Sequence, residues 1–213
     1  SGSFRFATTG TVTIRSVNDS FRDAQSLSTF TLNDNSLTMS GFTFGKSTNT
    51  SNITLDSAIT TSGAVTVYGS TINLYSNITS SGAGDITISA STKIEDNNTR
   101  RSVTNSSGDI YLIADSDGVG QLDIGYLTLD AGSDDLILRG FMFSWSTDSN
   151  NKKPYINGTG EVTIESTGTA FGQGMDTRWF YWNQDSNQIS SLTIGKSTNT
   201  QNVGFSYESG YGD

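Results

Sequence analysis

The sequence predicts an all-β fold in which short strands stack as the coils of a β-solenoid, and three observations lead to this prediction. Hydrophobic residues make up 33% of the 213 residues, charged residues make up 15%, and there is a single proline. Apolar residues alternate with polar ones at a period of two, and no stretch has the i, i+3, i+4, i+7 spacing of an amphipathic helix. The alternating segments also return at a nearly constant interval.

The predicted strands follow one another along the chain, and most begin after a turn signal, as in "SGAVTV", "GAGDITI", "SSGDIYL", "GSDDLIL" and "GTGEVTI". Each is marked by a pair of apolar residues two apart: Val12/Ile14, Val65/Val67, Ile72/Leu74, Ile86/Ile88, Ile110/Leu112, Leu127/Leu129, Leu136/Leu138 and Val162/Ile164. The first apolar residue after the turn recurs at positions 65, 86, 110, 136 and 162, so the interval changes little along the chain. Val12 precedes Val65 by two further steps of this kind.

These intervals suit a solenoid because a single coil cannot bury its few inward side chains alone. Stacked coils lie about 4.7–4.9 Å apart, so the inward valine, isoleucine and leucine residues form continuous apolar columns. A β-sandwich is the alternative fold, since it also contains short strands separated by turns. The near-constant spacing favours the solenoid, with coils of about 21–30 residues over a single continuous segment, residues 1–213.

An internal repeat supports a modular architecture. The hexapeptide "GKSTNT" occurs at 45–50 and again at 195–200, and residues 9–53 match 159–203 at 19 of 45 positions with an offset of 150. We expect both hexapeptides to form the same corner of the rod. Six coils would separate them by roughly 29 Å.

The stretch "GFTFGKSTNTSNITLDSAITTSGAVTVYGSTINLYSNITSSGAGDITISAS" (41–91) and the later "LTIGKSTNTQNV" resemble filamentous-haemagglutinin-like exoproteins of Gram-negative bacteria. This resemblance implies a right-handed parallel β-helix within a large secreted or surface-attached adhesin, often exported by two-partner secretion. Its partner would be a glycan or protein on a host or neighbouring cell. The NPNG signature of that family's secretion domain is not found in the sequence, so we expect an interior piece.

Composition limits the chemistry. Without histidine or cysteine the chain cannot form a Ser-His-Asp or Cys-His catalytic arrangement, a disulfide or a thiolate metal site. A net charge of −9 argues against nucleic-acid binding, and no apolar run is long enough to cross a membrane, so membrane insertion is not expected. Paired carboxylates could still provide glycosidase chemistry of the kind found in other β-helices. The candidate residues are Asp115, Asp117, Asp123, Asp130, Asp134 and Asp135, but their positions in turns explain them more simply. We expect no enzyme activity and no cofactor.

Two further polar features are interpreted in the same way. Asp115 and Asp117 in "DSDG" form a calcium candidate, but an acidic residue near the twelfth position of the loop is missing and a turn explains them better. The basic pairs Arg100-Arg101 and Lys152-Lys153 are interpreted as solvated loop residues.

Aromatic residues provide the candidate binding site. In "GFMFSWS", Phe141 and Phe143 are expected in the core, with Trp145 on the same face. The loop 173–188 lengthens one coil to about 30 residues and carries Trp179 and Tyr181, where the first copy of the repeat has Thr29 and Thr31 around an inward Phe30 that matches Phe180. Core and surface positions remain open for this pair. If they are exposed, they form a glycan-binding site with the neighbouring polar residues Arg178, Asp176 and Gln173.

Together with the resemblance, these features predict a non-enzymatic stalk or adhesive segment of an extracellular bacterial protein. One alternative is a glycan-binding module that uses the 173–188 loop. Another is a self-assembling filament subunit, because the two ends of a solenoid are open sheet edges that favour end-to-end association.

Overall fold

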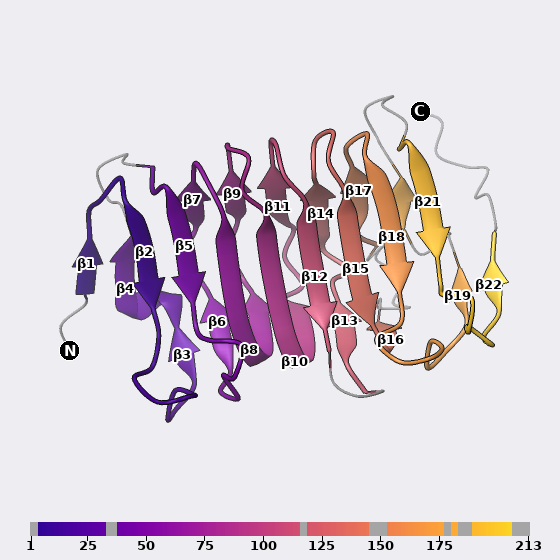
Figure 1. The fold of residues 1–213 in the computed structure, drawn as a ribbon, viewed down its shortest axis with the longest axis horizontal. Coiled ribbons are helices and arrows are strands. Elements are labelled where there is room, and N and C mark those ends of the chain that lie inside the picture. Colours follow the sequence, from indigo (N-terminus) through magenta and orange to yellow (C-terminus); the bar gives the residue numbers. More distant parts are fainter. Residues whose placement is uncertain are drawn as a thin grey trace.

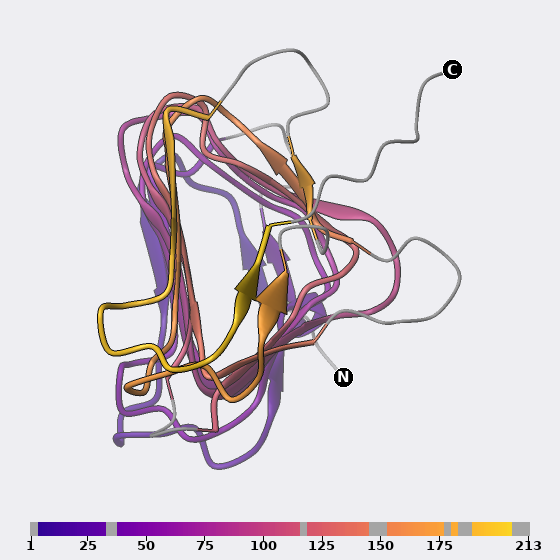
Figure 2. The same cartoon turned by 90° about the vertical axis from the view of Figure 1, so that its right-hand side faces the viewer.

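The computed structural model describes residues 4–32, 38–115, 119–144, 153–176, 180–182 and 189–205. These residues form a rod of stacked coils, and each coil has a triangular cross-section bounded by three faces of parallel strands (Figure 1 and Figure 2). In Figure 1 the front strands point down and the rear strands point up as the chain advances from left to right, which makes the coil right-handed. The predicted right-handed parallel β-helix is therefore confirmed.

The three faces are built from strands that recur in the same order. The first face contains β2 (Thr11–Ile14), β5 (Gly41–Phe44), the first parts of β8 (Val65–Leu74) and β10 (Ile86–Asp96), β12 (Ile110–Ala114), β15 (Leu136–Gly140), β18 (Glu161–Glu165) and β21 (Ser191–Ile194). The second face contains β3 (Gln25–Ser26), β6 (Ile53–Leu55), the second parts of β8 and β10, β13 (Gln121–Asp123), β16 (Met142–Ser144), β19 (Met175–Asp176) and β22 (Val203–Gly204). The third face contains β1 (Phe4–Phe6), β4 (Phe30–Leu32), β7 (Ile59–Thr61), β9 (Ile78–Ser80), β11 (Arg101–Asn105), β14 (Leu127–Asp130), β17 (Tyr155–Asn157) and β20 (Tyr181–Trp182). A short 3₁₀ helix, η1 (Leu27–Thr29), joins β3 to β4.

The register of the first face matches the predicted apolar column. Val12, Phe42, Val65, Ile86, Ile110, Leu136, Val162 and Leu192 are aligned strand by strand. Each step from one member of the column to the next falls within the expected coil length. Neighbouring strands in these pairings are parallel, which rules out the β-sandwich alternative for the described residues.

The core of the rod is a set of such columns. On the second face Phe143 continues the column of Ile72, Ile94 and Leu122, and all four side chains are at most 1% exposed. The predicted inward position of Phe143 is confirmed. The prediction that Phe141 lies in the core is wrong, because its side chain is only half-buried and packs beside Gly172, where an added Cβ would lie 2.5 Å from the ring. Trp145 lies outside the described residues.

The repeated hexapeptides adopt the same corner, as predicted. Gly45 and Gly195 both have a φ of 86°, a left-handed backbone conformation that glycine tolerates. In each copy the glycine N–H donates to an isoleucine carbonyl of the preceding coil at 2.8 Å. In each copy the asparagine Oδ1 also accepts a hydrogen bond from a phenylalanine N–H, at 3.1 Å and 3.2 Å (Asn49 with Phe21, Asn199 with Phe171). Six inter-strand steps, from β5 to β21, separate the two corners.

Candidate functional site

The residues of the predicted loop site are distributed over two faces of the rod. Gln173 lies before β19, and its Nε2 donates a hydrogen bond to the carbonyl of Phe143 in the preceding coil. Asp176 is the last residue of β19 on the second face, whereas Tyr181 begins β20 on the third face. Gln173 therefore helps to hold two coils together and does not lie on the same face as Tyr181. Arg178 and Trp179 lie outside the described residues.

Tyr181 belongs instead to a group that the structure assembles on the third face, here called the third-face cluster: Arg100, Tyr126, Lys153, Tyr155 and Tyr181. The rings of Tyr155 and Tyr181 are stacked with centroids 4.8 Å apart and an interplanar angle of 20°. The guanidinium carbon of Arg100 lies 4.0 Å from the centroid of the Tyr155 ring and 5.8 Å from that of Tyr126. Lys153 Nζ lies 5.2 Å from the centroid of Tyr181. All five side chains are half-buried.

Parallel register explains why these residues meet. Tyr155 aligns with Tyr181 in neighbouring strands of the third face, so the rings project from equivalent positions. Tyr155 and Tyr181 alternate with the buried Ile156 and Phe180, which places their side chains on the outer surface. The sequence signal for the pair is that positions 155 and 181 lie one coil apart. This signal is weak because outward positions carry no apolar period that would mark which of them align.

The prediction that the basic pairs are merely solvated is wrong for Arg100 and Arg101. Arg100 Nη1 donates to the carbonyl oxygens of Leu127 at 3.3 Å and Lys153 at 3.2 Å, and so its side chain spans two coils. Arg101 Nε donates to the carbonyl of Tyr75 at 2.9 Å. Long cationic side chains reach across neighbouring coils because the strands lie only about 4.8 Å apart.

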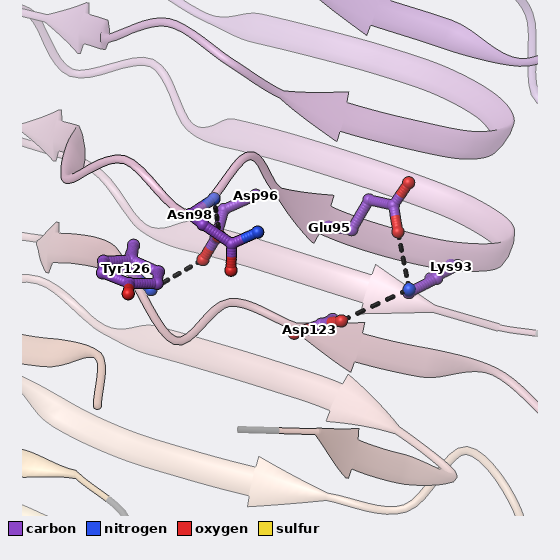
Figure 3. A network of polar contacts seen from close by, with 6 residues as sticks. All are labelled: Lys93, Glu95, Asp96, Asn98, Asp123 and Tyr126. Carbon is purple, nitrogen blue, oxygen red and sulfur yellow. Dashed lines mark hydrogen bonds and ion pairs between the residues drawn. The ribbon is translucent and has the colours of Figure 1, made fainter. Parts of the chain in front are cut away.

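Burial changes the pKa of two charged groups at the third-face cluster, Arg100 and Asp96. Burial lowers the pKa of the Arg100 guanidinium, and nearby Tyr155 and Asp96 offset part of this effect. Arginine nevertheless stays charged in proteins. Burial also raises the pKa of Asp96, although its carboxylate accepts hydrogen bonds from the backbone N–H groups of Tyr126 at 2.6 Å and Asn98 at 2.8 Å. Figure 3 shows Asp96 between these two residues.

Most of the carboxylates considered for catalysis or metal binding join neighbouring coils, and Asp130 stabilises a local turn. Asp109, Asp135 and Glu161 each donate a backbone N–H to the aspartate Oδ1 of the preceding coil, at 3.1, 3.0 and 3.0 Å (to Asp85, Asp109 and Asp135). Asp134 Oδ2 accepts from the N–H of Gly108 at 3.0 Å, and Asp130 Oδ1 accepts from the N–H of Gly132 at 2.9 Å. Asp123 forms an ion pair with Lys93 at 3.3 Å, and Lys93 also contacts Glu95 at 2.5 Å (Figure 3).

The calcium candidate has a single residue in the described part of the chain. Asp115 is exposed and its N–H donates to the carbonyl of Ala90 at 2.8 Å, while Asp117 lies outside the described residues. Across the described ranges, no group of three or more histidine, cysteine, aspartate or glutamate side chains is placed to hold a metal ion.

The aspartate column gives a testable pH dependence at Tyr111. Its hydroxyl donates to Asp109 Oδ2 at 2.7 Å, and this hydrogen bond, together with partial burial, raises the pKa of Tyr111 from 10.0 to about 12. A raised pKa means that the contribution of Tyr111 to stability is complete below pH 10 and is lost as the pH rises through about 12. The difference in tyrosinate absorbance between wild type and Tyr111→Phe should therefore titrate near pH 12. A difference curve with a midpoint near 10 would show that the hydrogen bond to Asp109 does not persist in solution.

Comparisons of the chain with protein-family models, with curated proteins and with solved structures find no match. None of the described helices is long and apolar enough to span a membrane. The arrangement of the third-face cluster therefore has to indicate a function by its own chemistry: it combines cationic groups, stacked tyrosine rings and tyrosine hydroxyl groups on an outer face of a rigid rod.

Proposed function

We propose that the chain is a non-enzymatic stalk or adhesive segment of a large extracellular bacterial surface protein, and that the third-face cluster is its contact surface. The observation that supports this most is the reuse of one corner, with the same backbone angle and hydrogen bonds, at 45–50 and 195–200. A corner that recurs after six coils is typical of a regular, extendable scaffold. A rod of this kind separates a contact surface from the surface that carries it.

The chemistry of the side chains also favours binding over catalysis. The chain has no histidine and no cysteine. The aspartates that occupy corners accept backbone hydrogen bonds from neighbouring coils, as the pairs Asp85/Asp109 and Asp109/Asp135 do. A carboxylate that accepts such backbone hydrogen bonds has a structural role, whereas an acid–base catalyst needs access to the reacting atom of a substrate.

Tyr181 is the one member of the third-face cluster that lies within the repeat, and it differs from its counterpart in the first copy. Phe180 is buried in the core, and its counterpart Phe30 packs against the same core as a partly buried residue. The next residue changes from Thr31 to Tyr181, which stacks on Tyr155. This change adds a large aromatic side chain to the surface next to a core phenylalanine that both copies keep, as expected for a binding surface on a shared scaffold.

Adherence of protein-coated beads to cultured cells tests this proposal, with wild type compared with Tyr181→Thr, the residue found in the first copy. Loss of one stacked aromatic contact should reduce adherence about threefold to tenfold. Tyr68→Thr, on the first face, is the matched control and should adhere like wild type; both variants should melt within a few degrees of it. If beads coated with wild type adhere no more than uncoated beads, the proposed adhesive function is wrong. If wild type and Tyr181→Thr adhere equally, the third-face cluster is not the contact surface.

A further inference from the structure

We propose that the third-face cluster binds the carboxylate groups of a linear acidic polysaccharide, with Arg100 and Tyr155 donating hydrogen bonds and Lys153 adding positive charge. This inference rests on the proposed function, in which the cluster is the contact surface, and it specifies the chemical class of the ligand. Which class fits depends on the parts of the cluster that are already occupied by protein and the parts that are not.

Both faces of the central ring, Tyr155, are occupied. Tyr155 has the Arg100 guanidinium 4.0 Å from its centroid and the Tyr181 ring 4.8 Å away. Arg100 comes from the N-terminal side of β17 along the rod, and Tyr181 comes from the next strand on the C-terminal side, so they cover opposite faces of the ring. A neutral sugar binds aromatic residues by laying its C–H groups on a free ring face. Tyr155 offers no such face, which makes a stacked neutral glycan a poor fit.

Hydrogen-bond donors, in contrast, remain available. A guanidinium carries five N–H donors in a planar fork that matches a carboxylate. The hydrogen bonds that Arg100 makes within the described residues, to Leu127 and Lys153, both use Nη1, so Nε and Nη2 donate to no described protein atom. The Tyr155 hydroxyl likewise has no hydrogen-bond partner among the described residues. Both residues are partly exposed, as a site for an external ligand requires.

Register gives the direction of the ligand. Arg101 pairs with Leu127, and Thr128 pairs with Tyr155, which aligns position 100 with 126 and position 126 with 153. Arg100 and Lys153 therefore start from equivalent backbone positions two coils apart, but the Arg100 side chain reaches across both coils to the Tyr155 ring. Lys153 Nζ lies over the Tyr181 ring in the next strand, so the two charged groups lie over the stacked rings of neighbouring coils. This arrangement suits a polymer that lies parallel to the rod axis and carries an acidic group on successive sugars.

The third-face cluster carries positive charge, unlike the chain as a whole. The net charge of −9 repels polyanions in general, so binding of an acidic polymer has to be a property of a particular surface. Asp96 is the carboxylate that acts on Arg100, and it is half-buried and accepts two backbone hydrogen bonds, which partly offset its negative charge. The two cations of the third-face cluster, Arg100 and Lys153, outnumber it.

Calorimetric titration with polygalacturonate, a linear polymer of carboxylated sugars, tests the inference, and the fully methyl-esterified polymer is the matched uncharged ligand. We expect wild type to bind the acid form and to bind the ester at least tenfold more weakly, because hydrogen bonds to charged groups are the stronger ones. Tyr155→Phe keeps the ring and removes one donor, and Arg100→Lys keeps the charge and removes the planar fork. Each should weaken binding of the acid form about tenfold. Tyr68→Phe, which removes a hydroxyl from the first face, should leave binding unchanged.

Each outcome decides the question. Equal binding of acid and ester, or an equal loss in Tyr68→Phe and Tyr155→Phe at unchanged melting temperature, would overturn the inference. If bead adherence depends on Tyr181 but polygalacturonate does not bind, the ligand class is wrong while the proposed contact surface stands. If adherence does not depend on Tyr181 and polygalacturonate binding does not depend on Tyr155, both proposals fail.

Discussion

Replacing Ile110 by alanine is expected to lower the free energy of unfolding by about 2–5 kcal/mol, the usual cost of a large-to-small change in a packed core. The Ile110 side chain is 0% exposed and lies between Ile86 and Leu136 in the inward column of the first face. Neighbouring coils cannot move inward to fill the space, because their backbones are fixed by hydrogen bonds to one another along the rod. Denaturant titration followed by circular dichroism measures this loss.

The matched substitution is Thr87→Ala, one residue along from Ile86 on the same strand. Thr87 is half-buried and points outward, next to Thr66 and Tyr111 in the neighbouring strands. Its loss should cost under about 0.5 kcal/mol, as for most surface substitutions. Equally small effects of the two substitutions would mean that Ile110 does not face the core of the protein in solution.

Gly45→Ala is expected to be the second large effect, and Gly195→Ala is its control in the other copy of the repeat. Both glycines have a φ of 86°, and a side chain in the left-handed region costs about 1–2 kcal/mol. Of these two glycines, only Gly45 has a following coil close to it among the described residues: an added Cβ would lie 2.4 Å from the carbonyl oxygen of Tyr68. At Gly195 the nearest atom would be Asn199 Nδ2, at 3.3 Å, on a side chain that can turn away.

Gly45→Ala should therefore cost about 1–3 kcal/mol more than Gly195→Ala, because the backbone around Tyr68 has to shift. Hydrogen exchange provides a second measurement. The amide of Gly45, which donates to the carbonyl of Ile14, should lose protection in Gly45→Ala. Similar free-energy losses for the two variants would indicate that the coils of 41–55 and 65–80 pack together less closely in solution.

Much of the fold could be predicted because a solenoid repeats its register along the sequence. Each inward position recurs once per coil, so the apolar column Val65, Ile86, Ile110, Leu136 and Val162 is visible as a spacing, and the structure aligns these residues with one another. The repeated hexapeptide likewise predicted a shared corner, since glycine at a left-handed position and an asparagine that bonds the backbone are local requirements.

The candidate site could be predicted only in part. Tyr181 was singled out from the sequence, but the polar residues chosen with it were its neighbours along the chain. In a solenoid the residues that touch on the surface are those one coil away, as Tyr155 and Tyr181 are. The sequence predicts a solvated Arg100 because nothing within a few positions suggests a partner, whereas its partners Leu127 and Lys153 lie in the next two coils.

The sequence by itself determined the coil length, the inward columns and the equivalence of the two corners, because backbone alternation and glycine geometry are local properties that repeat along the chain. The tertiary structure decided which outward side chains meet, and so it alone assembled the third-face cluster and assigned the corner aspartates to their neighbours' backbone amides. The physical reason is that outward residues carry no periodic constraint of their own. Their contacts depend on coil lengths that vary along the rod, and a shift of a single position would bring different side chains together.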